Sequence, residues 1–493
     1  MKIYLLSLLA GSIYPLGFAP FNIWPLSLIS VILFLHFLEK SIKENLFLIG
    51  LFYGVGLCSV GMSWMYVSIH YFGYVDIYVS AIITILFILA LALYFGLIGL
   101  MYKFLKTSTT VDVLFLFPFS WVFVEIIRSY LFTGFPWLIA GTSLGTSFLD
   151  GWTPILGVYG SSLFFVLVAS SFYLLIVKYL NKENIIYLTS FFILLILSSL
   201  LLKQLTWTHK IGEILISVYQ PNLELEEKWS FRGIEKTKDL IEDSIVNAKN
   251  SEFIFFPETA LIQSEMDLSD WLKDLEDKLK LKDIALITGI IGEISNQKVT
   301  NRVQGFGKAK GYYDKRHLVP FGEYVPLVDY FGKVLNLLGL ERLNNITTVP
   351  GENYNNIKVG EIRISPAICY EIAFNDLVRK ASSNSNLLLT ISNDTWFGRS
   401  IGPEQHLEIA QIRALEHQMS LIRSTNSGIS AIINKKGEII DRINHFQDYS
   451  LKENVDLYRG ETPFKKFGNK PVYFILLMIL TFLIFNKRTY VHI

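Results

Sequence analysis

The chain has 493 residues, of which 52% are hydrophobic, and its formal net charge at pH 7 is +1. This hydrophobic content is too high for a soluble enzyme, and the near-neutral charge gives no argument for a nucleic-acid partner. Apolar residues dominate from Met1 to about Leu202 and again from Pro471 to Phe485, whereas residues 203–470 alternate charged and apolar positions as a globular domain does. The sequence therefore predicts a membrane protein with a water-facing domain inserted before its last span.

Eight segments are apolar over about the 20 residues that a helix needs to cross a bilayer. They cover roughly residues 3–19, 22–38, 46–68, 76–101, 112–131, 159–181, 185–202 and 471–486. The first is expected to be retained and not cleaved as a signal peptide, because further spans follow at once. The predicted domains are thus 1–202 with seven spans, 203–470 as the water-facing domain, and 471–493 with the eighth span and a short cytoplasmic tail.

The basic residues of the short loops predict the orientation in the membrane. With a cytoplasmic N-terminus, the cytoplasmic side carries Lys2, Lys40, Lys43, Lys103, Lys106, Lys178, Lys182, Lys487 and Arg488. Among the short outer loops only Arg128 is basic, so residues 203–470 are expected outside the cytoplasm. Arg128 also lies three residues after Glu125 on one face of a span, which makes the two charges either a functional candidate or a self-paired structural feature.

The water-facing domain is predicted to be an α/β layered domain, because strand-like and helix-like segments alternate along it. Strands are expected at 213–219, 253–256, 285–291, 302–306, 386–392, 429–433 and 438–443, and helices at 230–250, 268–281 and from Pro403 onward.

Residues 361–374 are a mainly apolar run that contains Cys369, followed by Tyr370 and Glu371. The pattern predicts a buried strand that ends in a sharp turn, an arrangement that holds a nucleophile rigidly. Cys369 is the only cysteine of the water-facing domain, since Cys58 lies in an apolar segment, so the domain has no second thiol for a disulfide. The alternative interpretation of Cys369 is a small buried hydrophobic residue.

Two further residues at predicted strand ends suit the chemistry of a thiol. Glu258 follows the strand at 253–256, and Lys315 lies among aromatic residues at 312–324. A thiol needs a base to form the thiolate, and attack on a carbonyl needs a cation where the oxyanion develops. Taken singly, Glu258 is equally well a carboxylate at a helix start, and Lys315 a solvated surface lysine.

Four stretches resemble the nitrilase superfamily, whose members carry a Glu-Lys-Cys triad on an αββα sandwich: FPETA (256–260), YYDKRHLVPFGEYVP (312–326), AICYE (367–371) and NDTWFG (393–398). Together with eight spans and the stretches FAPFNIWPL (18–26) and TGFPWL (133–138), they make the chain similar to the membrane-bound branch of that superfamily, the bacterial apolipoprotein N-acyltransferases. The resemblance implies an eight-helix membrane domain joined to a nitrilase-like αββα sandwich inserted before the last helix. It also implies Glu258 as general base, Lys315 as oxyanion stabiliser and Cys369 as nucleophile.

The same resemblance implies supporting roles for Glu323, Tyr370 and Glu371, and for Trp229 near the substrate entrance. The implied reaction transfers an acyl chain from a phospholipid, with phosphatidylethanolamine as the expected donor, to the α-amine of the diacylglyceryl-cysteine of an apolipoprotein. A thioester on Cys369 is the implied intermediate, because an amine attacks a thioester readily. No cofactor and no metal are expected, and the expected location is the bacterial inner membrane with the catalytic domain on the periplasmic side.

Three alternatives remain open on the sequence alone. The first is a membrane-tethered amidase or nitrilase that uses the same triad on a small soluble amide. The second is a papain-like pair in which His317, His406 or His417 is the base; His406 is expected on the polar side of its helix. The third is a transporter or receptor with an outer binding domain, although transporters usually show polar interruptions within their spans.

The segment from Glu323 to Arg342 has an almost continuous apolar run that is too short to cross a bilayer. It is expected to be an interfacial arm that dips into the outer leaflet and guides lipids to Cys369. The alternative is a helix packed into the core of the water-facing domain.

Overall fold

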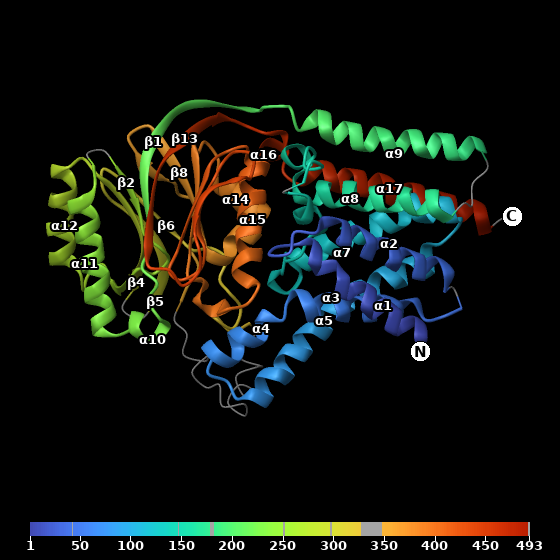
Figure 1. The fold of residues 1–493 in the computed structure, drawn as a ribbon, viewed down its shortest axis with the longest axis horizontal. Helices are drawn as coiled ribbons and strands as arrows, with labels where there is room; N and C mark the ends of the chain where they lie inside the picture. Colours follow the sequence, from blue (N-terminus) through green and yellow to red (C-terminus); the bar gives the residue numbers. More distant parts are fainter. Residues whose placement is uncertain are drawn as a thin grey trace.

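The computed structural model describes residues 1–41, 43–145, 147–177, 182–249, 252–295, 298–326 and 348–491. Most of the arm expected at residues 323–342 lies outside these described residues. Figure 1 shows two parts side by side: a helical region made of α1 to α9 and α17, and a sandwich made of β1 to β13 with α10 to α16. Both chain ends lie in the helical region, at its end remote from the sandwich.

The helical region consists of apolar helices that pack closely at glycines. Its helices are α1 (Lys2–Ile13), α2 (Trp24–Lys40), α3 (Leu46–Gly61), α4 (Trp64–Val67), α5 (Ile77–Leu105), α6 (Thr109–Val111), α7 (Phe117–Tyr130), α8 (Thr153–Val177), α9 (Lys182–Leu202) and α17 (Lys470–Val491). A Cβ added to Gly50 would lie 2.1 Å from the carbonyl oxygen of Phe95, and one added to Gly99 would lie 2.0 Å from that of Leu46. Small residues thus let α3 and α5 approach backbone to backbone, as helices in membranes do.

Several of these helices are long and apolar enough to cross a membrane. Within the described part of the chain there are five, at Ile77–Leu105, Thr109–Thr133, Thr153–Val177, Ile185–Leu202 and Lys470–Arg488. Counting Leu46–Gly61 and Trp64–Phe72, which meet at 54°, as one bent span gives six. The helix at the N-terminus, Lys2–Gly17, is shorter. The count of eight spans therefore stays a prediction.

The sequence left open that Glu125 and Arg128 form an ion pair with each other. Both residues are described by the structure and they form no such pair, so this interpretation is wrong. Glu125 Oε1 accepts hydrogen bonds from the indole N–H of Trp121 at 2.9 Å and from the backbone N–H of Ala140 at 2.7 Å. Arg128 Nη1 donates to the carbonyl oxygen of Trp137 at 2.7 Å. Both charges stabilise the loop that follows α7, whose buried backbone groups need hydrogen-bond partners.

The sandwich contains two mixed sheets. The first sheet has the order β13-β1-β2-β4-β5-β6, with β3 paired to β4; the second has the order β12-β11-β10-β9-β8-β7. The strands of the first sheet are β1 (Thr208–Gln220), β2 (Phe253–Phe255), β3 (Leu261–Ser264), β4 (Ala285–Ser295), β5 (Lys298–Gly307), β6 (Tyr312–Asp314) and β13 (Tyr449–Gly460). Those of the second are β7 (Ile357–Val359), β8 (Ile362–Ile368), β9 (Leu387–Ser392), β10 (Leu421–Thr425), β11 (Ser430–Ile433) and β12 (Ile439–Ile443).

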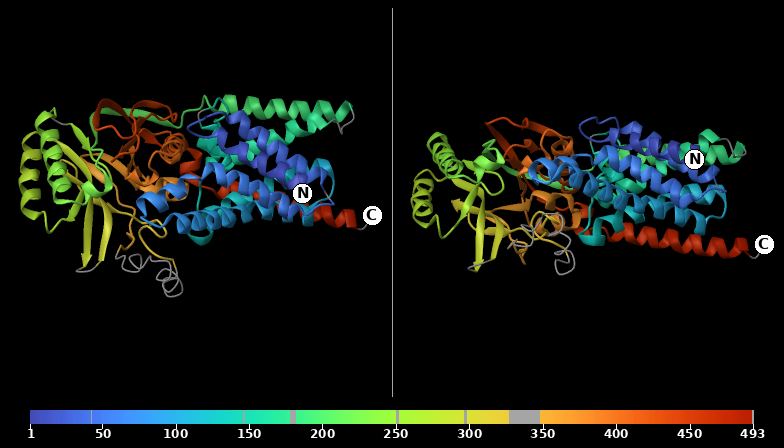
Figure 2. Two further views of the ribbon diagram at one scale, coloured as in Figure 1. Left: turned by 60° about the horizontal axis from the view of Figure 1, so that its bottom comes forward. Right: turned by 90° about the horizontal axis from the view of Figure 1, so that it is seen from below.

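Helices cover the outer faces of both sheets, which confirms the predicted αββα sandwich. In β2, Phe253 and Phe255 face the core between the sheets, whereas Ile254 faces α11 (Phe231–Asn247) and α12 (Ser269–Leu281), as the two-residue period of a strand requires. On the second sheet lie α14 (Asn375–Ala381) and α15 (Gly402–His417); α15 also contacts α8, and buried apolar residues of both helices belong to the core cluster of the helical region. All three views place α11 and α12 at the free end of the molecule (Figures 1 and 2). The second sheet and its helices therefore form the side of the sandwich that meets the membrane-type helices.

Candidate active site

Cys369 lies where β8 ends in a sharp turn, as the sequence predicts. β8 stops at Ile368, and Cys369 follows with a φ of +54° at the start of the short 3-10 helix η7 (Cys369–Ala373). A non-glycine residue is uncommon in this left-handed region, and strained residues of this kind gather at functional sites. The surrounding contacts must therefore hold the turn in place.

Glu371 provides part of that support. Its Oε1 accepts hydrogen bonds from the backbone N–H groups of Arg316 at 2.7 Å and His317 at 3.0 Å, and from the Tyr313 hydroxyl at 2.9 Å. Its Oε2 accepts from the backbone N–H of Ile368 at 2.8 Å. Burial raises the pKa of this carboxyl, although the backbone donors oppose the shift. Glu371 thus joins the turn at Cys369 to the segment that carries Lys315.

Glu258 is buried at the end of β2, between the two sheets. Its Oε1 accepts a hydrogen bond from the side-chain amide of Asn301 at 2.6 Å and lies 3.4 Å from Nζ of Lys315. Its Oε2 accepts from the backbone N–H of Asn393 at 2.7 Å. The carboxylate is therefore held in one orientation by partners from three different segments.

Lys315 is 1% exposed and lies between two carboxylates. Its Nζ is 3.4 Å from Glu258 Oε1 and 2.8 Å from Glu323 Oε2. Burial alone would lower the pKa of Lys315, but the carboxylates of Glu323 and Glu258 outweigh it and raise the pKa above its usual range. Lys315 is therefore a permanent cation in the folded protein.

The thiol of Cys369 shares the electrostatic environment of these charges. Burial raises its pKa well above the usual value, the negative charge of Glu258 raises it further, and Lys315 opposes both effects. The structure thus brings Glu258, Lys315 and Cys369 together closely enough to influence one another. A thiol with a raised pKa is protonated at neutral pH, so its reaction needs a base beside it.

The three histidines considered as bases have other partners. His406 is buried, not on a polar surface as expected, because α15 is covered by the second sheet on one side and by the helical region on the other. Its Nε2 lies 3.2 Å from the backbone carbonyl oxygen of Cys369, so its hydrogen-bond partner is the backbone of this residue and not the sulfur. Burial lowers the pKa of His317 to about 4 and that of His417 to about 3. The ring of His317 packs on Phe374, with 3.8 Å between the ring centroids.

The remaining predicted residues border the site in different ways. Glu323 binds Lys315 and also accepts from the backbone N–H of Val319 at 2.8 Å. The Tyr370 hydroxyl donates to the carbonyl oxygen of Gly134 at 2.9 Å, which connects the nucleophile turn to the helical region. Trp229 follows the short helix α10 (Leu225–Lys228) and is 55% exposed, as a residue at an entrance would be.

Three residues that contact the site were missed at the sequence level: Asn301, Asn393 and Lys228. Gln405, which was also missed, joins α15 to the helical region. Gln405 Oε1 accepts from the indole N–H groups of Trp64 at 3.2 Å and Trp137 at 2.7 Å. Asn393 contributes its backbone N–H, for which a sequence carries no signal.

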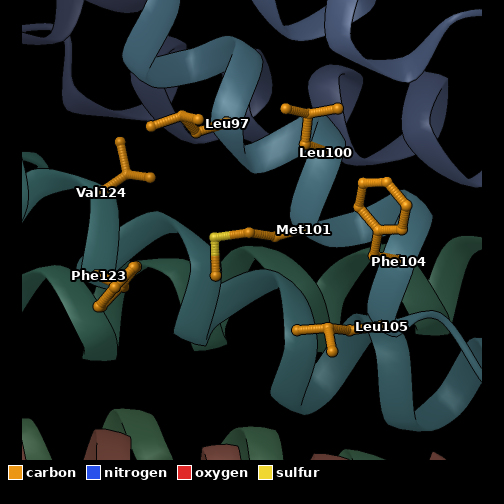
Figure 3. Close-up of a pocket in the computed structure, with 7 residues that line it drawn as sticks. All are labelled: Leu97, Leu100, Met101, Phe104, Leu105, Phe123 and Val124. Carbon is orange, nitrogen blue, oxygen red and sulfur yellow. The ribbon is translucent and has the colours of Figure 1, made fainter.

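An apolar pocket of about 320 Å³ lies elsewhere, between α5 and α7. It is lined by Leu97, Leu100, Met101, Phe104, Leu105, Phe123 and Val124 (Figure 3). None of these side chains offers an acid, a base or a nucleophile, so this pocket is no candidate for the chemistry.

Two family models match the chain. The one described as "Apolipoprotein N-acyltransferase N-terminal domain" matches residues 10–171, and the one described as "Carbon-nitrogen hydrolase" matches residues 215–460. A curated relative from Coxiella burnetii, an apolipoprotein N-acyltransferase, is 35% identical, over 97% of this chain and 99% of its own length. The protein of the same name from Pseudomonas aeruginosa is 33% identical, over 95% of this chain and 93% of its own.

Among solved structures, Saccharomyces cerevisiae Nit3, described as a member of branch 10 of the nitrilase superfamily, is 15% identical. It covers 50% of this chain and 91% of its own, with a TM-score of 0.39. Both curated relatives match this chain over nearly its full length, and the two family models match its two parts. These findings agree with the geometry of the site. The chain belongs to the apolipoprotein N-acyltransferase family.

Proposed function

We propose that the chain transfers a fatty acyl chain from a phospholipid to the α-amine of the diacylglyceryl-cysteine of an apolipoprotein, through a thioester on Cys369. Family membership supports the reaction. The observation that carries the mechanism is the shared buried site of Glu258, Lys315 and Cys369.

In the first half-reaction, the Glu258 carboxylate takes the proton of the Cys369 thiol, and the sulfur attacks the ester carbonyl carbon of the phospholipid. The carbonyl oxygen becomes an oxyanion, which the ammonium of Lys315 stabilises. Collapse of this intermediate breaks the bond between the carbonyl carbon and the glycerol oxygen. That oxygen leaves with the proton from Glu258, as lysophospholipid.

In the second half-reaction, the α-amine of the apolipoprotein attacks the thioester carbonyl. Lys315 again faces the oxyanion, and Glu258 accepts a proton from the attacking nitrogen. The C–S bond breaks, an amide forms, and the sulfur of Cys369 regains a proton. Two steps with a reactive thioester between them replace one difficult exchange of ester for amide.

Four neighbouring residues have supporting roles in this proposal. Glu323 keeps Lys315 charged and in place, and Glu371 holds the turn that presents Cys369. Tyr370 ties that turn to the helical region, and Trp229 borders the entrance for the lipid substrates.

The proposal includes eight spans, with residues 1–202 and 471–493 in the bacterial inner membrane and residues 203–470 on the periplasmic side. The basic residues predicted at the cytoplasmic loops support this orientation. The location of both chain ends at the side remote from the sandwich agrees with it (Figure 1). Phosphatidylethanolamine is the proposed donor, since it is the phospholipid that the family resemblance implies.

The test supplies the purified full chain with phosphatidylethanolamine and a diacylated lipopeptide, and follows the triacylated lipopeptide by mass spectrometry. We expect product from the parent and from Cys58→Ala, whose thiol is buried among helices, and none from Cys369→Ala. Product from Cys369→Ala would refute the thioester mechanism. Hydrolysis of small soluble amides without acyl transfer would favour the amidase alternative.

A further inference from the structure

Lys228, the last residue of α10, is a buried lysine beside the candidate base. Its Nζ donates hydrogen bonds of 2.9 Å to the carbonyl oxygen of Glu258 and 2.9 Å to the hydroxyl of Thr259. No carboxylate among the described residues forms an ion pair with it, so neutral oxygens hold this charge. Burying an ammonium group without a paired carboxylate is costly, and natural sequences accept such costs mainly at functional sites.

The segment that Lys228 binds is strained. Thr259 has a φ of +46°, which is a genuine outlier for a β-branched residue. The segment also packs against Gly289 of β4, where an added Cβ would lie 2.4 Å from the backbone nitrogen of Thr259 and 2.6 Å from the carbonyl oxygen of Pro257. A strained backbone conformation persists only where several surrounding contacts hold it in place. The hydrogen bonds of Lys228 and the close packing of Gly289 both contribute to that constraint.

Lys228 therefore fixes the backbone of the same residue whose carboxylate is held by Asn301, Asn393 and Lys315. Burial lowers the pKa of Lys228, and the electrostatic interactions with Glu258 and Cys369 partly oppose this shift.

The position of α10 connects this lysine to the helical region. Glu226 of α10 accepts a hydrogen bond of 3.1 Å from the hydroxyl of Tyr74, which lies just before α5. The next residue after Lys228 is the exposed Trp229. Along the chain, Lys228 thus adjoins the exposed Trp229, and in space it binds the backbone of the candidate base.

We propose that Lys228 is a positioning residue, which sets the geometry of Glu258 through the Glu258–Thr259 backbone and needs its positive charge to do so. This inference rests on the proposed function, because it assigns Lys228 to the same site. If the positive charge of Lys228 is needed, the rate of thioester formation should fall when Lys228 loses its proton. A lysine with a purely structural role would not cause this dependence on pH.

Burial lowers the pKa of Lys228 to about 8, while Glu258 and Cys369 oppose the shift. On its own element, Glu226 is bound to Tyr74, and Glu227 lies 3.7 Å from Lys236 of α11. Lys228 is charged below its pKa and loses its charge as the pH rises through about 8. We expect the geometry of Glu258 to deteriorate over the same pH range.

The experiment measures the single-turnover rate of thioester formation with phosphatidylethanolamine, on the full chain, from about pH 6 to about pH 10. The variants are Lys228→Met, which keeps the length of the side chain without its charge, and Lys228→Arg, which keeps the charge. Lys236→Met, an exposed lysine on the neighbouring helix, is the control.

We expect Lys228→Met to lower the rate about tenfold or more near pH 7, the effect of about 1.4 kcal/mol in the barrier, and to remove the decline above pH 8. Lys228→Arg should restore part of the rate and move the decline to higher pH, because a guanidinium stays protonated. Lys236→Met should follow the parent. Parent rates and an unchanged pH profile in Lys228→Met would overturn the proposal.

Thr259→Val provides a second variant if Lys228→Met does not fold. It removes one of the two acceptors of Lys228, so a loss of several-fold is expected, and a parent rate would again count against the proposal. If the parent forms no thioester at all, the proposed function fails. If the parent forms it and Lys228→Met equals the parent, only the role of Lys228 fails.

Discussion

Nε2 of His406 lies 3.2 Å from the carbonyl oxygen of Cys369, on the backbone of the candidate nucleophile. The other ring nitrogen, Nδ1, lies 3.0 Å from Oδ1 of Asp394, and Oδ2 of Asp394 is paired with Arg423. Both nitrogens are therefore engaged away from the sulfur. This arrangement makes His406 a support for the strained turn at Cys369 and argues against a histidine base.

The first prediction follows from that contact. His406→Ala should slow thioester formation about fivefold, because a single hydrogen bond contributes on the order of 1 kcal/mol. Rapid-quench measurement of the acylation step checks this value. A folded His406→Ala protein that has lost acylation altogether would show instead that the histidine acts as the base.

Glu258→Gln keeps the shape of the side chain and removes its basicity. We expect thioester formation to slow by roughly a hundredfold or more, the usual effect of losing a general base. Because Asn301 and the backbone N–H of Asn393 both donate to this carboxylate, the amide also disturbs one of these contacts. Burst kinetics equal to those of the parent would indicate that another group, such as Glu323, removes the proton.

Lys315→Ala removes the cation that is proposed to stabilise the developing oxyanion. We expect a loss of transition-state stabilisation on the order of 3 kcal/mol, which is more than a hundredfold in rate. The variant also leaves Glu258 and Glu323 without their shared counter-ion, so thermal unfolding must be measured alongside activity. Lys310→Ala, an exposed lysine paired with Glu276, is the matched control and should react as the parent does. Near-parent acylation by folded Lys315→Ala would remove Lys315 from the mechanism.

A pH effect on stability is expected from Glu408, a buried carboxyl of α15 that accepts a hydrogen bond of 3.3 Å from the backbone N–H of Ala19. Burial raises its pKa from 4.5 to about 8. Between these two values the folded chain holds a proton that the unfolded chain releases. The stability from this proton is fully present below about pH 4.5 and is lost as the pH rises through about 8.

Thermal midpoints of the parent should therefore fall between mildly acidic and alkaline pH by more than those of Glu408→Gln, which cannot ionise. Between these pH values, the unfolding free energy of the parent should fall by an amount on the order of a few kcal/mol more than that of Glu408→Gln. Glu235→Gln, on the exposed side of α11, should track the parent. Identical pH dependence in parent and Glu408→Gln would show that this carboxyl is not buried at the junction.

The alternation of strands and helices in the domain could be predicted from the residues alone, and the αββα sandwich from the family resemblance. The roles of Glu258, Lys315 and Cys369 stay predictions. The continuously apolar residues 253–256 and the apolar run before Cys369 predict buried strands, because both faces of such a strand are apolar. The predicted helices at 230–250 and 268–281 correspond closely to α11 and α12. The strands β10 and β13 were not predicted. β10 is fully buried although it contains polar residues, which form hydrogen bonds there. β13 lies at the edge of its sheet, and charged residues alternate along it.

The contacts that support the site could not be predicted in the same way. His406 looked like a polar surface residue because its helix is rich in charged groups, yet the helical region covers that surface. Glu125 and Arg128 have helix spacing that suits a pair, but backbone groups of a later loop compete for both. Lys228 binds a carbonyl oxygen and a hydroxyl, which are acceptors that leave no pattern in a sequence.

The central claim is that Cys369 carries the acyl chain. Its most direct test incubates the full chain with phosphatidylethanolamine, without any acceptor, and measures the mass of the peptide that contains Cys369. We expect that peptide to gain the mass of one fatty acyl group, to lose it on addition of a diacylated lipopeptide or hydroxylamine, and to show no gain in Cys369→Ser. An unmodified Cys369 peptide in a preparation that still produces triacylated lipopeptide would contradict the account.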